Sequence, residues 1–154
     1  MGETKAMLLD IMRQTGSPAF NDYIDTCMDL SPPFEGDDLL RAFARRSGYV
    51  RDWTLFLADD PLVLTPFLLA PTFSWNRDME GPEGAADVMI KSFYSIAMNY
   101  LGLPAGNVPA HYNDGLPIGV QIVGRRFRED MILDACEAVE TRVSVMADRL
   151  FERG

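Results

Sequence analysis

NYLGLPAGNVPAHYNDGLPIGVQIVGRR, residues 99–126, is the stretch that decides the fold. Its opening predicts the end of a helix, because Gly102 stands where a helix C-cap glycine is usual and Pro104 cannot continue a helix. A short strand is expected over residues 105–110, where Pro109 restricts it to the edge of a sheet or to a strand end. The stretch therefore begins as a helix that leads into an edge strand.

A tight turn and a buried strand complete this stretch. Asn113, Asp114 and Gly115 form an Asn-Asp-Gly sequence, which is a strong signal for a turn between two strands. Residues 116–123 are apolar and rich in β-branched side chains apart from Gln121, a pattern typical of a strand buried on both faces. Gly124 is expected to end this strand.

The order of these motifs resembles the C-terminal signature of the amidase signature family of hydrolases. The similar pieces are Leu-Gly-Leu-Pro-Ala at 101–105, Val-Pro at 108–109, Gly-Leu-Pro-Ile-Gly-Val-Gln-Ile-Val-Gly at 115–124 and Arg-Phe-Arg-Glu-Asp at 126–130. Upstream, Asp60 precedes Leu-Val-Leu-Thr-Pro at 62–66, and Ala-Pro follows at 70–71. The resemblance is specific over residues 59–140. It implies an α/β fold, a mixed sheet of few strands packed with helices, as a C-terminal fragment of the amidase signature fold.

The rest of the chain predicts further helices and one more strand. Ser17 and Pro18 suit the N-cap and first position of a helix that ends at Ser31, and Asp37 or Asp38 suits the start of the next. We expect one domain, residues 1–154, with 1–58 mainly helical and 59–154 in the order strand, helix, strand, strand, helix. The other expected elements are helices over residues 5–14, 39–57, 87–101 (capped by Asp87) and 130–153, a strand over 62–69 and a loop over 72–84.

Composition excludes several classes of partner. The net charge of −9 leaves no basic stripe for nucleic acid. No apolar run reaches the roughly 18 residues of a membrane span, and no signal peptide is expected, so we predict no membrane partner. Cys27 and Cys136 stand far apart and the chain has one histidine, too few ligands for structural zinc. We therefore expect reduced thiols, a cytoplasmic location, and neither metal nor cofactor.

The resemblance implies amide hydrolysis. Members of the family use a serine nucleophile, a second serine in a cis peptide bond and a lysine base, with backbone N–H groups of a glycine-rich loop around the oxyanion. That apparatus belongs to a Gly-Gly-Ser-Ser segment and an upstream lysine, and this sequence contains no such segment and only two lysines, Lys5 and Lys91. No catalytic residue is carried over. We expect a truncated chain that is inactive alone and has an N-terminal catalytic portion as its partner.

Two local pairs offer a different catalytic set. Lys91 and Ser95 stand four residues apart, formally a serine–lysine pair, but an exposed lysine keeps its proton and is no base. His111 with Asp114 could imitate part of a triad, or His111 could lie near the mouth of a pocket. An aspartate in a turn ordinarily bonds its own backbone. For both pairs we favour the interpretation that the residues are neighbours by chance and have no catalytic role.

The resemblance also places three residues at the substrate pocket. In the family, the helix before the Leu-Gly-Leu-Pro motif and the loop after the Thr-Pro strand line part of the pocket, and Thr65, Ser92 and Ser95 fall there. The alternative is hydroxyl-to-backbone bonding within each local segment. Members of the family that transamidate charged tRNA with glutamine look to have an acidic residue near the position of Ser92. The serine at this position therefore weakens the hypothesis that the chain belongs to that group.

The resulting prediction is the C-terminal part of an amidase that hydrolyses the C–N bond of a small carboxamide. The chain would form scaffold and part of the pocket. The alternatives are a non-catalytic binding or assembly module and a subunit that completes the pocket of another chain. Because few strands remain, we expect an exposed sheet edge and a homo-oligomer or aggregate. A well-behaved monomer at high concentration in analytical ultracentrifugation would contradict that expectation.

Overall fold

The computed structural model describes residues 2–143, and their contacts group into two compact units. One, here called the helical unit, comprises Met1–Ser47 and Phe73–Ile90. The other, here called the sheet unit, comprises Gly48–Thr72 and Lys91–Gly154. The single domain over residues 1–154 stays a prediction.

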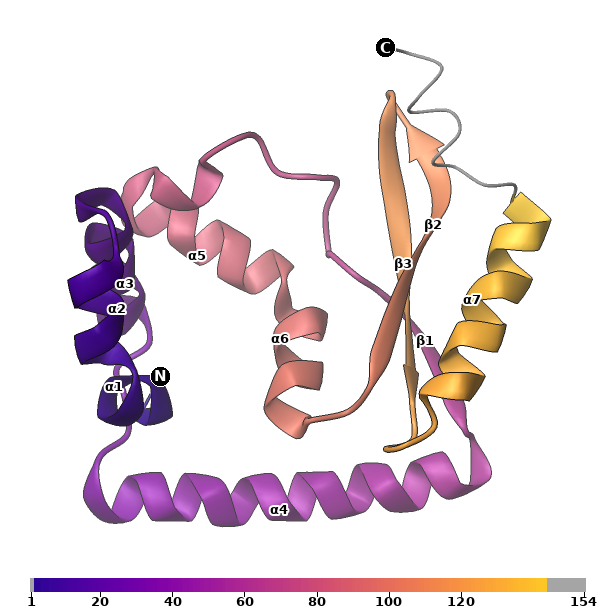
Figure 1. Ribbon diagram of the computed structural model, residues 1–154, viewed down its shortest axis with the longest axis horizontal. Helices are drawn as coiled ribbons and strands as arrows, with labels where there is room; N and C mark the ends of the chain where they lie inside the picture. The colour runs from indigo at the N-terminus through magenta and orange to yellow at the C-terminus, as the bar shows by residue number, and fades with distance from the viewer. Residues whose placement is uncertain (1, 144–154) are drawn as a thin grey trace. The chain divides into compact units, whose positions relative to one another are not determined.

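Short helices form most of the helical unit, and local capping explains where one of them, α3, begins. Ser17 caps α3 as expected, because its Oγ accepts a hydrogen bond from the Phe20 N–H at 3.2 Å and Pro18 occupies the first turn. The helix expected over residues 5–14 is divided at Leu8. The elements are α1 Gly2–Met7, α2 Leu9–Thr15, α3 Pro18–Leu30, the first part of α4 Gly36–Asp59, the 3-10 turn η1 Arg77–Met79 and nearly all of α5 Gly81–Lys91 (Figure 1).

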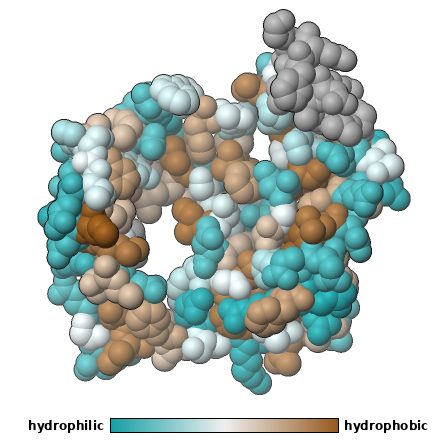
Figure 2. All heavy atoms as spheres, in the orientation of Figure 1, coloured by the Kyte–Doolittle hydropathy of each residue, from teal (hydrophilic) through white to brown (hydrophobic). Residues whose placement is uncertain are grey.

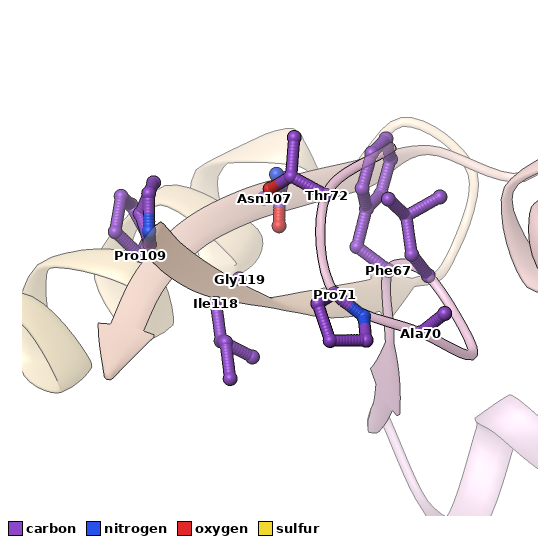
Figure 3. Close-up of a pocket in the computed structure, with 10 residues that line it drawn as sticks. Phe67, Ala70, Pro71, Thr72, Asn107, Pro109, Ile118 and Gly119 are labelled. Carbon is purple, nitrogen blue, oxygen red and sulfur yellow. The ribbon is translucent and has the colours of Figure 1, made fainter. Parts of the chain in front are cut away.

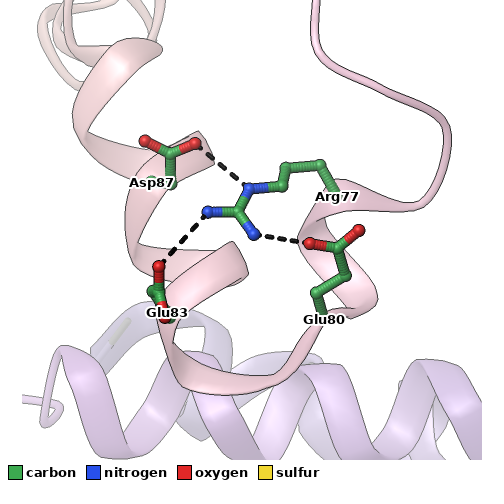
Figure 4. A network of polar contacts seen from close by, with 4 residues as sticks. All are labelled: Arg77, Glu80, Glu83 and Asp87. Carbon is green, nitrogen blue, oxygen red and sulfur yellow. Dashed lines mark hydrogen bonds and ion pairs between the residues drawn. The ribbon is translucent and has the colours of Figure 1, made fainter.

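A cluster of charges joins η1 to α5. The Arg77 guanidinium donates to Glu80 at 2.5 Å and to Asp87 at 3.2 Å, and it lies 3.8 Å from Glu83 (Figure 4). The expectation that Asp87 caps a helix over 87–101 is therefore wrong. Asp87 lies inside α5, which begins at Gly81, and its carboxylate pairs with Arg77.

The helix expected over residues 87–101 is two helices. Ser92 separates α5 from α6 Phe93–Leu101 and stands at the N-cap of α6. The C-terminus of α6 is as expected, because Gly102 takes the left-handed conformation, with φ 65°, and its N–H bonds back into the helix. The helix expected over 39–57 is confirmed as α4, which runs unbroken through Gly48.

Three strands form the sheet in the order β1-β3-β2. They are β1 Leu62–Pro66, β2 Ala105–Asn113 and β3 Leu116–Gly124. Asp114 and Gly115 both have positive φ, 49° and 81°, as a two-residue hairpin turn requires. Such a turn can join only antiparallel strands. The α/β class with few strands is confirmed, and the described sheet is antiparallel in both pairings rather than mixed.

The strand boundaries differ from expectation at prolines. β1 ends at Pro66 instead of residue 69, because proline has no N–H to continue the ladder. Pro109 lies on an edge strand as expected, but β2 continues past it to Asn113 after a shift of register between Pro109 and His111. A bulge there lets pairing resume beyond the proline.

Helices cover both faces of one end of the sheet. On one face, Val123 packs with Leu57 of α4 and with Met98 and Leu101 of α6. On the other, Ile122 packs with Val108 and with Ile132 of α7 Glu129–Val143. Neighbouring residues of a strand point to opposite faces, which explains the two clusters. Figure 1 shows α6 and α7 on opposite sides of the hairpin. Full burial of each such side chain contributes about 1.5–3 kcal/mol.

The other end of β3 is open. The strand was expected to be buried on both faces throughout, and this is wrong for its first half, where Leu116 is 44% and Ile118 is 37% exposed. The reason is that α4, α6 and α7 contact the end near Val123. Of the final helix, expected over 130–153, residues 144–153 lie outside the described range.

Apolar side chains also remain at the surface of both units (Figure 2). In the helical unit, Ile11 is 58% and Phe34 is 54% exposed; in the sheet unit, Leu64 is 62% exposed. Across residues 2–143, no helix is both long and apolar enough to span a membrane.

Candidate functional site

A polar row crosses the sheet beyond the covered end. Thr65 of β1 and Asn107 of β2 are both direct partners of Gln121 on the central strand, so the three side chains belong to one face. This is the face on which Val123 packs, two residues further along β3. The row marks the point where the apolar core ends and a polar surface begins.

Gln121 is the buried member of the row. It is 3% exposed, and its Nε2 donates a hydrogen bond to the Thr65 Oγ1 at 3.1 Å. A buried amide needs such partners, because leaving one donor unsatisfied costs about 1–3 kcal/mol. The Thr65 hydroxyl therefore has a structural task, the support of Gln121, which joins two strands that are 56 residues apart in the chain.

A cavity of about 260 Å³ opens beside this row (Figure 3). The segment that follows β1, residues 67–72, forms one side, and β2 and β3 form the other. The Leu69 N–H donates to the Lys91 carbonyl at 2.8 Å, which ties this segment to the last residue of α5. The lining residues are Phe67, Leu68, Ala70, Pro71, Thr72, Asn107, Pro109, Pro117, Ile118 and Gly119.

Asn107 supplies a side-chain amide to the cavity. Its carboxamide lies over Gly119, so closely that a Cβ at position 119 would stand 2.6 Å from the Asn107 Oδ1. Only glycine leaves room for this approach. The pair Asn107 and Gly119 therefore forms a flat polar patch beside walls that are mainly apolar.

Thr65, Ser92 and Ser95 lie in two segments that meet near the cavity. Thr65 belongs to the polar row, whereas Ser92 and Ser95 are half-buried at the start of α6, directly after Lys91. None of the three is among the residues that line the described cavity. Contact of these hydroxyls with substrate stays a prediction.

The two local catalytic pairs gain no support. Lys91 ends α5 and Ser95 lies in α6, so they do not share one regular helix. His111 is exposed on β2, and Asp114 forms the hairpin turn. Within residues 2–143 no group of three or more His, Cys, Asp or Glu residues is placed to hold a metal ion.

Asn107, Gly119 and Gln121 were not singled out as site residues from the sequence. The one available signal was Gln121, a lone polar residue in an apolar strand. Asn107 and Gly119 carry no such signal, because their proximity depends on the register between β2 and β3.

These features define an α/β protein with a pocket between the segment that follows a Thr-Pro strand and a Gly-Leu-Pro hairpin. The Amidase family model matches residues 3–133, and the chain belongs to this family. Among curated relatives, an indoleacetamide hydrolase of Bradyrhizobium diazoefficiens is 42% identical over 114 residues, 73% of this chain and 22% of the hydrolase. A glutamyl-tRNA(Gln) amidotransferase subunit of Streptococcus equi subsp. zooepidemicus is 31% identical over 86% of this chain and 28% of its own length.

Solved structures show the same fold. A 6-aminohexanoate cyclic dimer hydrolase, complexed with substrate, matches with a TM-score of 0.57 and 23% identity over 73% of this chain and 26% of its own. The corresponding amidotransferase subunit of Thermotoga maritima matches with a TM-score of 0.56 and 20% identity over 92% of this chain and 27% of its own. The chain thus spans about a quarter of the length of the relatives and structures it matches.

Proposed function

We propose that this chain is the C-terminal part of an amidase that hydrolyses the C–N bond of a carboxamide to a carboxylate and ammonia or an amine. The observation that carries the proposal is the cavity of about 260 Å³, bordered by the Ala-Pro segment after β1 and by the Gly-Leu-Pro hairpin. The chain provides scaffold and one side of the substrate pocket.

The relatives support an amide as substrate. One is named an indoleacetamide hydrolase and another a 6-aminohexanoate cyclic dimer hydrolase, and both names describe hydrolysis of amide compounds. The sequence holds no Gly-Gly-Ser-Ser segment, and in the proposed function an N-terminal catalytic portion supplies the serine nucleophile and the lysine base. The chain alone is then inactive. Two free thiols, Cys27 and Cys136, accord with a cytoplasmic location.

Complementation tests this function. The chain is mixed with the part of the Bradyrhizobium hydrolase outside its matched segment, and ammonia release from indole-3-acetamide is measured. We expect ammonia from the mixture and none from either part alone. A matched control mixture carries the nucleophilic serine of the hydrolase part replaced by alanine, and it should release none.

Two outcomes would contradict the proposal. One is ammonia release by this chain alone, which would place the catalytic apparatus within it. The other is a stable complex of the two parts without hydrolysis, which would favour the alternative of a non-catalytic binding or assembly module.

A further inference from the structure

We propose that Asn107 is a specificity-determining residue, which hydrogen-bonds the polar edge of a flat aromatic group of the amide substrate inside the cavity beside Gly119. The inference rests on the proposed function, since it assigns the acyl side of that substrate. It names a class of substrate, arylacetamide-like amides whose ring carries a hydrogen-bond donor or acceptor.

The shape and chemistry of the cavity favour a flat apolar group. Three of its lining residues are prolines, Pro71, Pro109 and Pro117, and Phe67 adds an aromatic side chain. Figure 3 shows Phe67 and Pro71 on the segment after β1, across from Asn107 and Pro109 on β2. These rigid rings lose little conformational entropy when a ligand packs against them.

The volume sets the size of the group. An apolar cavity of about 150 Å³ is enough to hold a benzene ring. Pockets that bind drug-sized ligands have volumes of about 300–1,000 Å³. At about 260 Å³, this cavity is large enough for a group of one or two rings.

Asn107 is the amide in the row that is available to a ligand. Gln121 is 3% exposed and its Nε2 is already bonded to Thr65, whereas Asn107 is exposed at the cavity. A carboxamide offers two donor hydrogens and an acceptor oxygen, so it can bond a ring N–H or a ring acceptor. Gly119 holds no side chain that would push the amide away.

The test compares two probes of similar size with the full 154-residue chain. Indole-3-acetamide has a ring N–H, and 1-naphthaleneacetamide has two rings and none. Dissociation constants are measured by ligand-detected NMR, and circular dichroism checks that each variant stays folded. One neutral hydrogen bond corresponds to a preference of about threefold to tenfold for the indole probe.

Asn107→Ala should abolish this preference and leave binding of the naphthalene probe nearly unchanged. Gly119→Ala should do the same, because its methyl group displaces the Asn107 amide. Asn113→Ala is the matched control, an exposed asparagine at the far end of the same strand, and it should keep the preference.

Two results would overturn the inference. A preference that survives Asn107→Ala overturns the role of Asn107, and the absence of saturable binding by either probe overturns the site. Because binding is measured without hydrolysis, the two proposals fail separately. Asn107-dependent binding without activity in the complementation assay rejects the amidase function alone. Activity without any effect of Asn107→Ala on the preference between the two amides rejects this inference alone.

Discussion

The helical unit and the sheet unit are stabilised in different ways. Within residues 2–143, both clusters of buried apolar residues lie in the sheet unit, around Val123 on one face and Ile122 on the other. The helical unit has few buried apolar side chains, among them Ile24 and Cys27. Its ion pairs Lys5–Glu35 and Arg13–Asp25 are exposed, whereas the pair of Arg77 with Asp87 is partly buried. Exposed ion pairs contribute little to stability. We therefore infer that the sheet unit carries most of the free energy of unfolding.

The difference between the two units shows what strand pairing contributes beyond local sequence signals. In the helical unit, the start of α3 follows from its own Ser17-Pro18 cap, yet many apolar residues of the unit stay exposed. In the sheet unit, pairing of β1, β2 and β3 brings apolar residues from distant segments to the same two faces. Substitutions in the two units should accordingly differ in size, with the largest losses of stability in the sheet unit.

Leu57→Ala should have the largest effect. Leu57 is 1% exposed and packs with Met98, Leu101 and Val123, so its truncation leaves a cavity in the sheet unit. We expect a loss of about 2–5 kcal/mol in the free energy of unfolding. Urea denaturation followed by fluorescence of Trp53, which packs against this cluster, measures it. Leu55→Ala, on the same helix and 56% exposed, is the control and should change stability by less than about 0.5 kcal/mol. Equal effects would refute the proposed core.

Glycine substitutions should have opposite signs at two positions. A Cβ at position 124 would stand 2.8 Å from the Ile132 Cγ1, so Gly124→Ala should destabilise the sheet unit by about 1–3 kcal/mol. Gly48 faces open space inside α4, and Gly48→Ala should stabilise the helix by about 0.5–1 kcal/mol. Both are measured by thermal and urea denaturation. A neutral or stabilising Gly124→Ala would contradict the packing of α7 on β3.

Alkaline pH should weaken the helical unit through Tyr23. Burial, with the neighbouring Cys27 and Asp78, raises the pKa of Tyr23 from 10.0 to about 12. The folded state thus favours the neutral phenol, so its stabilising effect is complete below pH 10.0 and is lost as the pH rises to about 12. Urea titrations across this range should show a fall in stability that Tyr23→Phe reduces. Tyr49→Phe, at a tyrosine that is 53% exposed, is the control and should leave the fall in place.

Arg77→Gln should have the smallest effect. The substitution removes the contacts with Glu80, Glu83 and Asp87 that join η1 to α5, and Glu80 and then Asp87 raise the pKa of Arg77 further above its ordinary value. We expect a slight lowering of the denaturation midpoint that diminishes in high salt, because salt screens exposed charges. Arg51→Gln, at a side chain that is 74% exposed, should give no salt-dependent shift. A loss as large as that of Leu57→Ala would contradict the difference between the units.

Several features of this protein follow from local sequence alone. The left-handed Gly102, the Asp114-Gly115 turn and the Ser17-Pro18 helix start were all predictable. Each depends on the steric and hydrogen-bonding properties of one to three neighbouring residues. The family resemblance was also visible in the sequence, because its motifs are themselves turns and strand ends.

Tertiary structure decided the features that join distant residues. Asp87 was expected to cap a helix, and the structure places its carboxylate on Arg77 inside α5. The bond from Gln121 to Thr65 was not visible in the sequence either, because it joins two strands. Asn107 and Gly119 meet only through the pairing of β2 with β3. Sequence determines backbone choices over a few residues, whereas the partner of a side chain depends on which strands and helices pack together.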